Sequence, residues 1–580
     1  MVNKAWRIIP RPLIETVLNN HVQHHRVPQP LILHGPRGAG KTTLLLNRLL
    51  PYWNKPPHQT TYIDFAESIT DHHPLHNNSF PWYSWSICEQ KPSLSTLKSQ
   101  LELGLEQMTE KAIKLGLIGS TQIFNCLNKW HGVSTALRRV TNCSDTVRVN
   151  DMWEKAVRVN IESVRLNATE SDGVLGEERE YYREAMAALR VAKEVIRMKE
   201  GWRENAVKEL NQRGGFSRSL ANSSTDWPCL LLELLSQAAE VGHFQPKLVL
   251  NNIDVLQTAI LTDDTTVCAS MYHDSLLWRI IRLGANERCL PVILVTSDRQ
   301  VLVFSIMMMN LICKFGLPAI IPTEHILILA FQMYSSPVSW DWLVPVQYFG
   351  LTPQQAKMHL VNDYFSNSEW TVIAEVLGSN ARHLFELYAL KQSNYCQKVM
   401  ENKASSFEDI IDAYLAHLQV TVVNPAMERA LSFLQKFAVD VQSGRISKDR
   451  LQFGTPWRHP PRTDEPALCY EWAKIQLLDF VQSLINAEFG CRLKVNYLAD
   501  WSLEIFDDPS AIALIEVGLL YVQRDPSFLR PVSRAIQRCL VRWLVQERMQ
   551  MNSWGSLKYK WQRVIRGRSY RHLMLEAGFK

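Results

Sequence analysis

The sequence has no cysteine pair at the spacing of a zinc site or of a redox motif. Its eleven cysteines are scattered over 580 residues, and no C-x-x-C pair occurs. Isolated thiols of this kind are typical of proteins from reducing compartments, where disulfides rarely persist. The sequence also shows no secretory signal peptide, and its start, MVNKAWRIIPRPL, looks like part of a fold. We therefore expect an intracellular, soluble protein without disulfides or a zinc ribbon.

A long uninterrupted apolar run is missing as well. The most apolar segment, residues 301–321, is broken by Asn310, Lys314, Gly316 and Pro318. A membrane-spanning helix needs about 20 mostly apolar residues. We interpret this segment as a buried helix and expect no membrane partner.

The sequence has no large excess of charge of either sign. The chain has 63 Lys and Arg against 57 Asp and Glu, a formal net charge of +6. An excess this small gives no argument for nucleic acid by itself. A hydrophobic content of 46% with 21% charged residues is that of a folded protein. The length suggests about three to four domains.

Strands and helices alternate in two parts of the chain. The first part has a helical pattern over 11–27, an apolar strand at 31–34, a glycine-rich loop, a leucine-rich helix to about residue 50 and a strand at 60–65. The second part has helical patterns at 230–241 and 275–283, each followed by a strand, in KLVLNNID and PVILVTSD. Such alternation predicts an α/β fold with a doubly wound parallel sheet.

The rest of the chain is predicted to be mainly helical. Residues 66–225 leave the alternating pattern, and within them 177–210 carry apolar residues at helical spacing among charges of both signs. That pattern indicates a long, partly solvated helix. We interpret 66–225 as a helical insertion, and helical signals dominate again from about residue 350.

The segment GPRGAGKT, residues 35–42, matches G-x-x-x-x-G-K-[ST] without a gap. Glycines in such a loop let backbone N–H groups approach phosphate oxygens, which side chains would prevent. The motif follows an apolar strand and opens a helix, whose positive N-terminal end favours an anion. We expect Lys41 to reach the β- and γ-phosphates of ATP and Thr42 to offer its hydroxyl to Mg²⁺. The residues predicted to bind the nucleotide are Gly35, Pro36, Arg37, Gly38, Ala39, Gly40, Lys41, Thr42 and Thr43.

The acidic residue that such a site needs is not where the pattern predicts it. In LVLNNIDVL the apolar run ends in Asn251 and Asn252. An amide is a poor substitute, because it neither carries the negative charge nor accepts a proton from water. Asp254 follows two residues after Asn252, so on an extended strand both would face the same side. Asp254 is therefore predicted to serve Mg²⁺ or the attacking water; the alternative is that it caps the next helix.

A third strand ends in polar residues. PVILVTSD finishes in Thr296, Ser297 and Asp298. A polar side chain at the carboxyl edge of a parallel sheet, beside the strand that carries the glycine loop, can orient water or a γ-phosphate. Ser297 is our candidate for that role, and a turn or a helix cap is the alternative interpretation.

Together these segments resemble the AAA+ and STAND superfamily of P-loop ATPases, nearest to its origin-recognition-like and archaeal-ATPase branches. IIPRPLIETVL, the glycine loop, LVLNNIDVL and VILVTSD occur in the family's order, and GLTPQQAKMHL and LGSNARHLFEL resemble the helical lid. The resemblance covers about 1–65 and 226–400, and it implies that Arg382 of the lid approaches the γ-phosphate. The chain departs from the family in its two asparagines, in its insertion and in the long apolar run after Asp298, for which an error in the gene model is the alternative to a buried helix. No arginine finger is assigned, and the candidates are Arg279, Arg282, Arg288 and Arg299.

The patterns and the resemblance together predict five parts. They are a P-loop ATPase core (1–65 and 226–345), the helical insertion (66–225), a helical lid (346–402), a mainly helical or winged-helix C-terminal domain (403–545) and a basic tail (546–580). The winged-helix expectation depends on 507–544, where a helix, GLLYVQRD, a turn and another helix follow one another. A plain helical bundle is the alternative.

Three functions fit this organisation. The first is an ATP-dependent conformational switch with slow hydrolysis and a protein partner at the insertion or the C-terminal domain. The second is an active ATPase that uses Asp254. The third is an initiator-like DNA-binding ATPase, in which the winged helix and the basic segment Gly555–His572 contact DNA; the alternative for that segment is a solvated tail. An oligomer is compatible with all three.

Overall fold

The computed structural model falls into two compact units. It describes residues 6–55, 58–66, 92–129, 176–212, 226–239, 244–259, 269–297, 345–347, 350–393, 406–443, 460–461, 465–489, 509–523, 528–551, 553–557 and 559. One unit consists of residues 10–34 and 41–348, and we call it the sheet unit. The other consists of residues 1–9, 35–40 and 349–580, and we call it the C-terminal unit.

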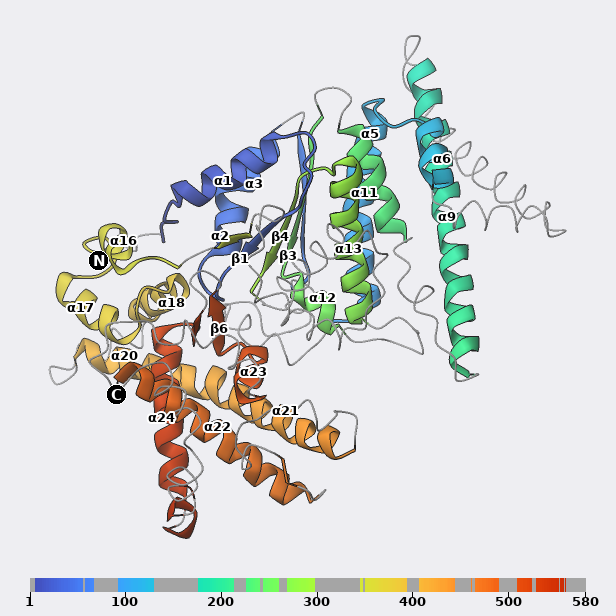
Figure 1. The fold of residues 1–580 in the computed structure, drawn as a ribbon. Helices are drawn as coiled ribbons and strands as arrows, with labels where there is room; N and C mark the ends of the chain where they lie inside the picture. The colour runs from blue at the N-terminus through green and yellow to red at the C-terminus, as the bar shows by residue number, and fades with distance from the viewer. Residues whose placement is uncertain are drawn as a thin grey trace, which may run out of the picture. The chain divides into compact units, whose positions relative to one another are not determined.

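The sheet unit is built on a parallel sheet (Figure 1). Its strands are β1 (Leu31–His34), β2 (Gln59–Asp64), β3 (Pro246–Asn251), β4 (Val292–Thr296) and β5 (Pro345–Gln347). They lie in the order β2-β3-β4-β1-β5, and every neighbouring pair is parallel. The predicted α/β class and the parallel sheet are confirmed.

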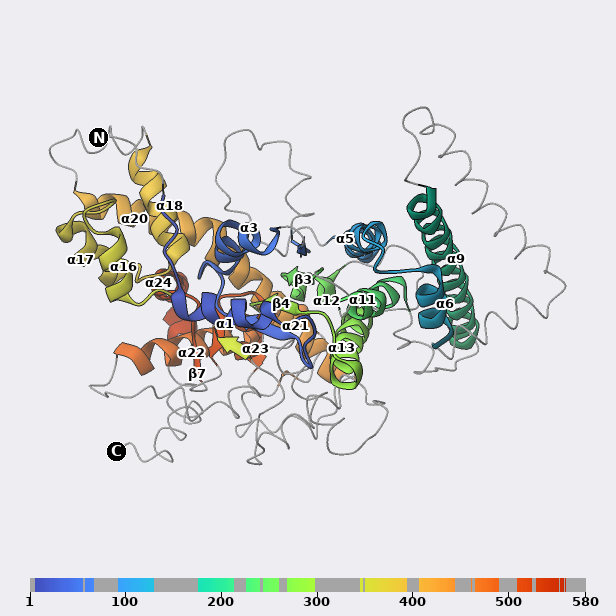
Figure 2. The same cartoon turned by 90° about the horizontal axis from the view of Figure 1, so that it is seen from above.

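Helices cover both faces of this sheet (Figures 1 and 2). On one face lie α1 (Pro12–Gln23) and the continuous helical run α2 (Lys41–Leu44), η1 (Leu45–Leu49) and α3 (Leu50–Trp53). On the other lie α5 (Leu94–Lys114), α11 (Trp227–Ala238) and α13 (Ala269–Glu287). All residues of β1, β3 and β4 are buried. Burial on both faces explains why these strands are continuous apolar runs instead of alternating ones.

Helices from the predicted insertion share the core of the sheet unit. The described ones are α5, α6 (Ser120–Lys129) and α9 (Gly176–Gln212). Leu101 of α5, Ile63 of β2 and Leu189 of α9 belong to one cluster of buried apolar residues. The sheet and these helices therefore bury apolar surface together.

The C-terminal unit is mainly helical. Its elements are α16 (Pro353–Leu360), α17 (Asn367–Val376), α18 (Ala381–Gln392), α20 (Phe407–Leu418), η3 (Gln419–Val423), α21 (Asn424–Gln442), α22 (Pro466–Phe489), α23 (Pro509–Glu516), β6 (Leu520–Gln523), β7 (Phe528–Pro531) and α24 (Arg534–Gln550). Thr352, Ser366, Asn380 and Ser533 cap the starts of their helices with side-chain hydrogen bonds. β6 and β7 form an antiparallel hairpin between α23 and α24.

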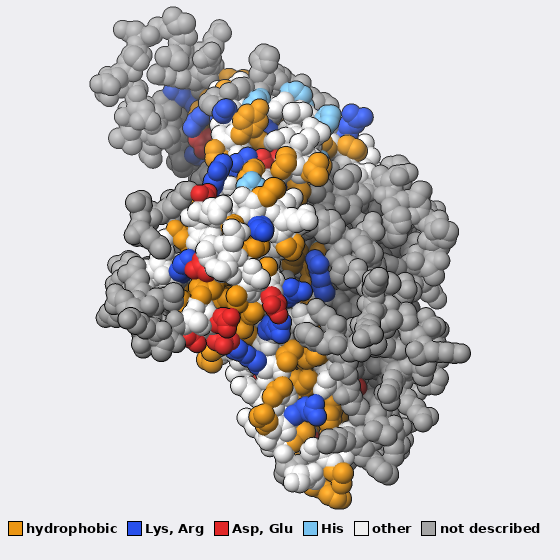
Figure 3. Space-filling view, turned by 90° about the vertical axis from the view of Figure 1, so that its left-hand side faces the viewer, with side chains coloured by type: hydrophobic (Ala, Val, Ile, Leu, Met, Phe, Trp, Pro, Cys, Tyr) orange, Lys and Arg blue, Asp and Glu red, His pale blue; other side chains and the backbone are white. Residues whose placement is uncertain are grey.

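Two sequence predictions concern segments that lie wholly or mostly outside the described residues, 301–321 and 546–580. None of the described helices is long and apolar enough to cross a membrane, and the apolar segment 301–321 lies outside the described residues. The first residues of the predicted basic tail, 546–550, are the end of α24. Most of Gly555–His572 lies outside the described residues. On the face shown in Figure 3, Lys and Arg side chains are interspersed with acidic and apolar ones.

Candidate functional site

The glycine loop, residues 35–40, joins the end of β1 to the start of α2. Gly38 and Gly40 have φ angles of 77° and 99°, a backbone region that side chains disfavour. The chain leaves β1 for β2 on one side, whereas after β4 it reaches β5 on the other side of β1. The loop therefore follows the strand at which the winding of the sheet reverses. In open α/β sheets this is where ligands bind.

The loop packs against α18 within the C-terminal unit. The backbone N–H of Arg382 donates to the carbonyl of Gly38 at 3.1 Å, and Asn380 Nδ2 donates to the carbonyl of Arg37 at 3.3 Å. A Cβ atom at Gly38 would come within 2.8 Å of Asn380 Oδ1. Glycine at 38 is thus required both by its φ angle and by the approach of the first turn of α18.

The loop also touches the segment that leads into the hairpin. The guanidinium of Arg37 lies against Gly518, where a Cβ atom would be 2.7 Å from Arg37 Nη1. Gly518 has a φ of 76° and lies between α23 and β6. Loop residues 37 and 38 therefore contact two separate parts of the C-terminal unit.

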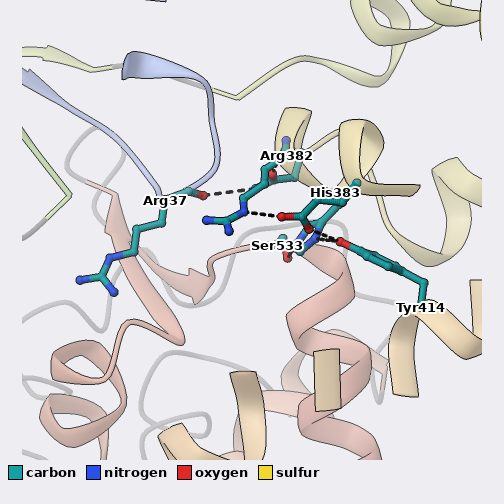
Figure 4. Close-up of polar contacts among 7 residues, drawn as sticks. Arg37, Arg382, His383, Tyr414 and Ser533 are labelled. Carbon is teal, nitrogen blue, oxygen red and sulfur yellow. Dashed lines mark hydrogen bonds and ion pairs between the residues drawn. The ribbon is translucent and has the colours of Figure 1, made fainter. Parts of the chain in front are cut away.

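The side chain of Arg382 is bound inside the C-terminal unit (Figure 4). Arg382 Nε donates to Glu386 Oε1 at 2.6 Å, and the hydroxyl of Tyr414 donates to Glu386 Oε2 at 2.7 Å. The Glu386 side chain is 2% exposed. The guanidinium that the family resemblance implies near a γ-phosphate is thus held by a buried carboxylate in this structure.

His383 extends this network to the start of α24. Its Nδ1 lies 2.7 Å from the Tyr414 hydroxyl and its Nε2 lies 2.7 Å from Ser533 Oγ. Because Tyr414 gives its proton to Glu386, its oxygen accepts from Nδ1–H, and Nε2 then accepts from Ser533. Ser533 Oγ also accepts from the N–H of Ile536, which caps α24. One chain of hydrogen bonds therefore joins α18, α20 and α24.

This network makes a testable prediction about acid stability. Burial, and then the charge of Arg382, lowers the pKa of His383 from 6.5 to about 3. As the pH falls below 6.5 the unfolded chain takes up a proton that the folded chain rejects, so stability is lost down to about pH 3. Between about pH 7 and about pH 5 the loss from this residue is on the order of 2 kcal/mol.

Urea unfolding at those two pH values is the measurement. In His383→Gln the difference between the two pH values should shrink by that amount, because the group that titrates is gone. An unchanged pH dependence in the variant would contradict the prediction.

At the carboxyl edge of the sheet, Asn251 occupies the end of β3. It is fully buried, and its Nδ2 lies 2.7 Å from Asp64 Oδ2, 2.9 Å from the Tyr62 hydroxyl and 3.2 Å from Thr42 Oγ1. Asn252 Nδ2 donates to Asp64 Oδ1 at 2.7 Å. The two asparagines thus surround a carboxylate from β2, next to the hydroxyl predicted to ligate Mg²⁺.

Asp254 lies elsewhere than expected. β3 ends at Asn251, Asn252 has a φ of 53°, and Asp254 is the first residue of α12 (Asp254–Thr258). The expectation of an extended strand through Asp254 is therefore wrong, because the chain turns at Asn252. Asp254 is buried, and the hydroxyl of Thr296 donates to its Oδ1 at 3.3 Å.

The other predicted positions are spread over the sheet unit. β4 lies beside β1, as expected, and half-buried Ser297 follows directly after it; Asp298 and Arg299 lie outside the described residues. Lys41, Thr42 and Thr43 open α2. Among the arginine-finger candidates, Arg279 forms an ion pair with buried Glu233, while Arg282 and Arg288 are exposed.

The sequence analysis missed the two residues that organise these clusters, Asp64 and Glu386. Asp64 ends a strand, and the same reasoning that selected Ser297 would have selected it. Glu386 follows Arg382 by one helical turn, a spacing at which opposite charges meet. Tyr414 and Ser533 gave no such local signal.

The described residues include no group of three or more His, Cys, Asp or Glu side chains arranged to hold a metal. Mg²⁺ at a nucleotide site needs no such group, since phosphate oxygens, water and one or two protein oxygens suffice.

A scan against models of known protein families finds no match for this chain, and a search of curated proteins finds no relative. The fold defines a protein of the α/β class with a helical C-terminal unit.

Proposed function

We propose that this protein binds ATP with Mg²⁺ through residues 35–43 and works as a nucleotide-dependent conformational switch. The loop's backbone N–H groups and Lys41 would hold the phosphates, and the hydroxyl of Thr42 would face the metal. Bound Mg²⁺ would supply positive charge that offsets the negative charge of the phosphates. The motif, the positive φ angles of Gly38 and Gly40, and the reversal of the sheet's winding support this proposal.

The observation that carries the switch is the pair of hydrogen bonds from α18 to the carbonyls of Arg37 and Gly38. A ligand that rearranges the loop acts on these two bonds first. A movement of α18 would also move α20 and α24, because hydrogen bonds join these helices. Glu386 and His383 of α18 both bond Tyr414 of α20. His383 also bonds Ser533, which caps α24. Nucleotide can shift such an equilibrium only through its different affinity for the two states. Phosphate contacts that only the rearranged loop can make would supply that difference, against the cost of breaking the hydrogen bonds to the carbonyls of Arg37 and Gly38.

Arg382 gives the switch its second position. In the state described here its guanidinium forms an ion pair with Glu386. A γ-phosphate would compete with Glu386 for this guanidinium and would leave the Glu386 carboxylate with the Tyr414 hydroxyl as its donor. We therefore propose two states, one with Arg382 on Glu386 and one with Arg382 on the nucleotide.

Lys41→Ala tests the binding step. In the wild type, ATP at about 100 times its Kd should raise the free energy of unfolding by about 2.7 kcal/mol. Lys41→Ala should lose nearly all of that gain, because the phosphates then lose the ammonium group of Lys41. Thermal or urea unfolding with and without Mg-ATP measures it.

Lys55→Ala is the matched control, since this exposed lysine also belongs to the sheet unit but lies outside the proposed site, residues 35–43. It should keep the full gain. Equal gains in wild type and Lys41→Ala would reject the loop as the binding site.

Hydrolysis and DNA binding stay predictions of the sequence. An active ATPase needs a carboxylate near the attacking water, and Asp254 is engaged with Thr296. DNA binding depends on a basic segment that lies mostly outside the described residues. A conformational switch needs neither.

A further inference from the structure

The carboxylate that β3 lacks is present one strand away. β2 and β3 are paired so that Asp64 lies directly opposite Asn251. Each oxygen of Asp64 accepts a hydrogen bond of 2.7 Å from an asparagine amide, Oδ2 from Asn251 and Oδ1 from Asn252. The same amide of Asn251 reaches Thr42 Oγ1 at 3.2 Å. A single amide group therefore separates this carboxylate from the hydroxyl at the start of α2.

The charge of Asp64 is held in place without being neutralised. Besides the two amides, Oδ1 accepts from the N–H of Ala66 at 2.9 Å and Oδ2 from the Tyr62 hydroxyl at 3.1 Å. All four donors are neutral. Within the described ranges, no Lys, Arg or His forms an ion pair with Asp64. A fixed, uncompensated carboxylate at the edge of the sheet is a site for a cation.

The carbonyl oxygen of the Asn251 side chain, Oδ1, gives independent support. This atom is buried and accepts no hydrogen bond from any described residue. Buried polar atoms without a partner are rare, because they lose their bonds to water and gain none. A water molecule bound to a cation beside Asp64 would donate the missing hydrogen bond.

The position of Asp64 explains why residues 251 and 252 carry amides instead of carboxylates. An aspartate at 251 would place a second carboxylate at hydrogen-bonding distance from Asp64. Two such charges cannot both stay ionised without a large penalty. With the acid on β2, amides on β3 are the complementary choice.

We propose that Asp64 is the carboxylate that holds the hydrated Mg²⁺ of the bound nucleotide through water, in place of the acid missing from β3. Thr42 ligates the ion directly, and Asn251 orients both the carboxylate and the bound water. This inference depends on the nucleotide binding proposed above. It moves the predicted metal-binding acid from Asp254 to Asp64.

The test is a Mg²⁺ titration of nucleotide binding, with a fluorescent ATP analogue as the probe and EDTA as the metal-free reference. Asp64→Asn should not weaken binding in EDTA, because it only removes a negative charge, and it should raise the Mg²⁺ concentration for half-maximal effect on the order of 10- to 100-fold, as for other outer ligands of a metal. Asp412→Asn, which removes an exposed acid from α20, should leave it unchanged.

The double variant Asp64→Asn with Asn251→Asp returns the acid to β3 and keeps one acid and one amide in the pair. It should recover most of the Mg²⁺ dependence, even where Asp64→Asn alone folds poorly. Asn251→Asp alone should lower the melting temperature, because it faces Asp64.

The outcomes separate the two proposals. If the wild type binds the analogue and Asp64→Asn keeps the same Mg²⁺ dependence, the role of Asp64 is wrong and nucleotide binding stands. If neither wild type nor variants bind the analogue, with or without Mg²⁺, both proposals fall. Failure of the double variant to recover Mg²⁺ dependence would also overturn the role of Asp64.

Discussion

Replacing Glu386 with alanine should lower the free energy of unfolding of the C-terminal unit by about 3–5 kcal/mol. The reason is the partners that the carboxylate leaves behind. Arg382 would keep its charge in a largely buried place without a counter-ion, and the Tyr414 hydroxyl would lose its acceptor. Loss of one member of a buried ion pair costs more than the pair contributes when intact. Urea unfolding followed by circular dichroism measures the change.

Glu428→Ala is the control for this experiment. Glu428 is exposed on α21, a helix of the same unit. Surface substitutions of this kind usually change stability by about 0.5 kcal/mol or less. A loss below about 1 kcal/mol in Glu386→Ala, a value typical of exposed pairs, would contradict the buried network.

Glu386→Gln extends the experiment to the switch. The amide keeps the shape of the side chain but no longer neutralises Arg382. ATP should then stabilise the variant more than it stabilises the wild type, because a phosphate meets a guanidinium with no competing carboxylate. Equal stabilisation by ATP would argue against the two positions proposed for Arg382.

Trp227→Ala should lower the free energy of unfolding of the sheet unit by about 3–5 kcal/mol. Trp227 is 1% exposed at the start of α11, and its indole N–H donates to Glu106 Oε1 of α5 at 2.6 Å. Lys193 of α9 pairs with the same glutamate and lies over the indole ring. The substitution leaves a cavity where three helices meet, and it removes the hydrogen bond to Glu106.

This variant also tests how residues 66–225 fold. Because α5 and α9 share the core of the sheet, we expect the sheet unit to unfold in one cooperative transition that shifts as a whole. Trp554→Ala, at a side chain that is 74% exposed, should have little effect. Two separate transitions within the sheet unit, of which only one responds to Trp227→Ala, would mean that the insertion folds on its own.

Much of the fold could be predicted because its signals are local. The apolar runs that became β1, β3 and β4 lie next to helical patterns in the sequence, and alternation of this kind favours a parallel sheet. The glycine loop was recognisable because a backbone with positive φ at residues 38 and 40 requires glycine there. Between α23 and α24 the sequence showed GLLYVQRD and a turn, but it did not show the second strand of the hairpin, β7.

The geometry around Asp254 could not be predicted in the same way. Spacing along a strand predicts a common face only while the strand stays extended. Asn252 adopts a left-handed conformation, which ends the strand and starts α12. Asparagine tolerates this conformation better than most residues, but a single asparagine is not enough to predict a turn.

By itself, the sequence determined the α/β class, the glycine loop and the absence of an acidic pair at residues 251 and 252. Only the tertiary structure decided which carboxylate stands beside those asparagines, because Asp64 and Asn251 are 187 residues apart and meet through strand order and register. It likewise joined His383 to Ser533 across 150 residues. Periodicity and propensity describe neighbours along the chain, whereas a site is made of neighbours in space.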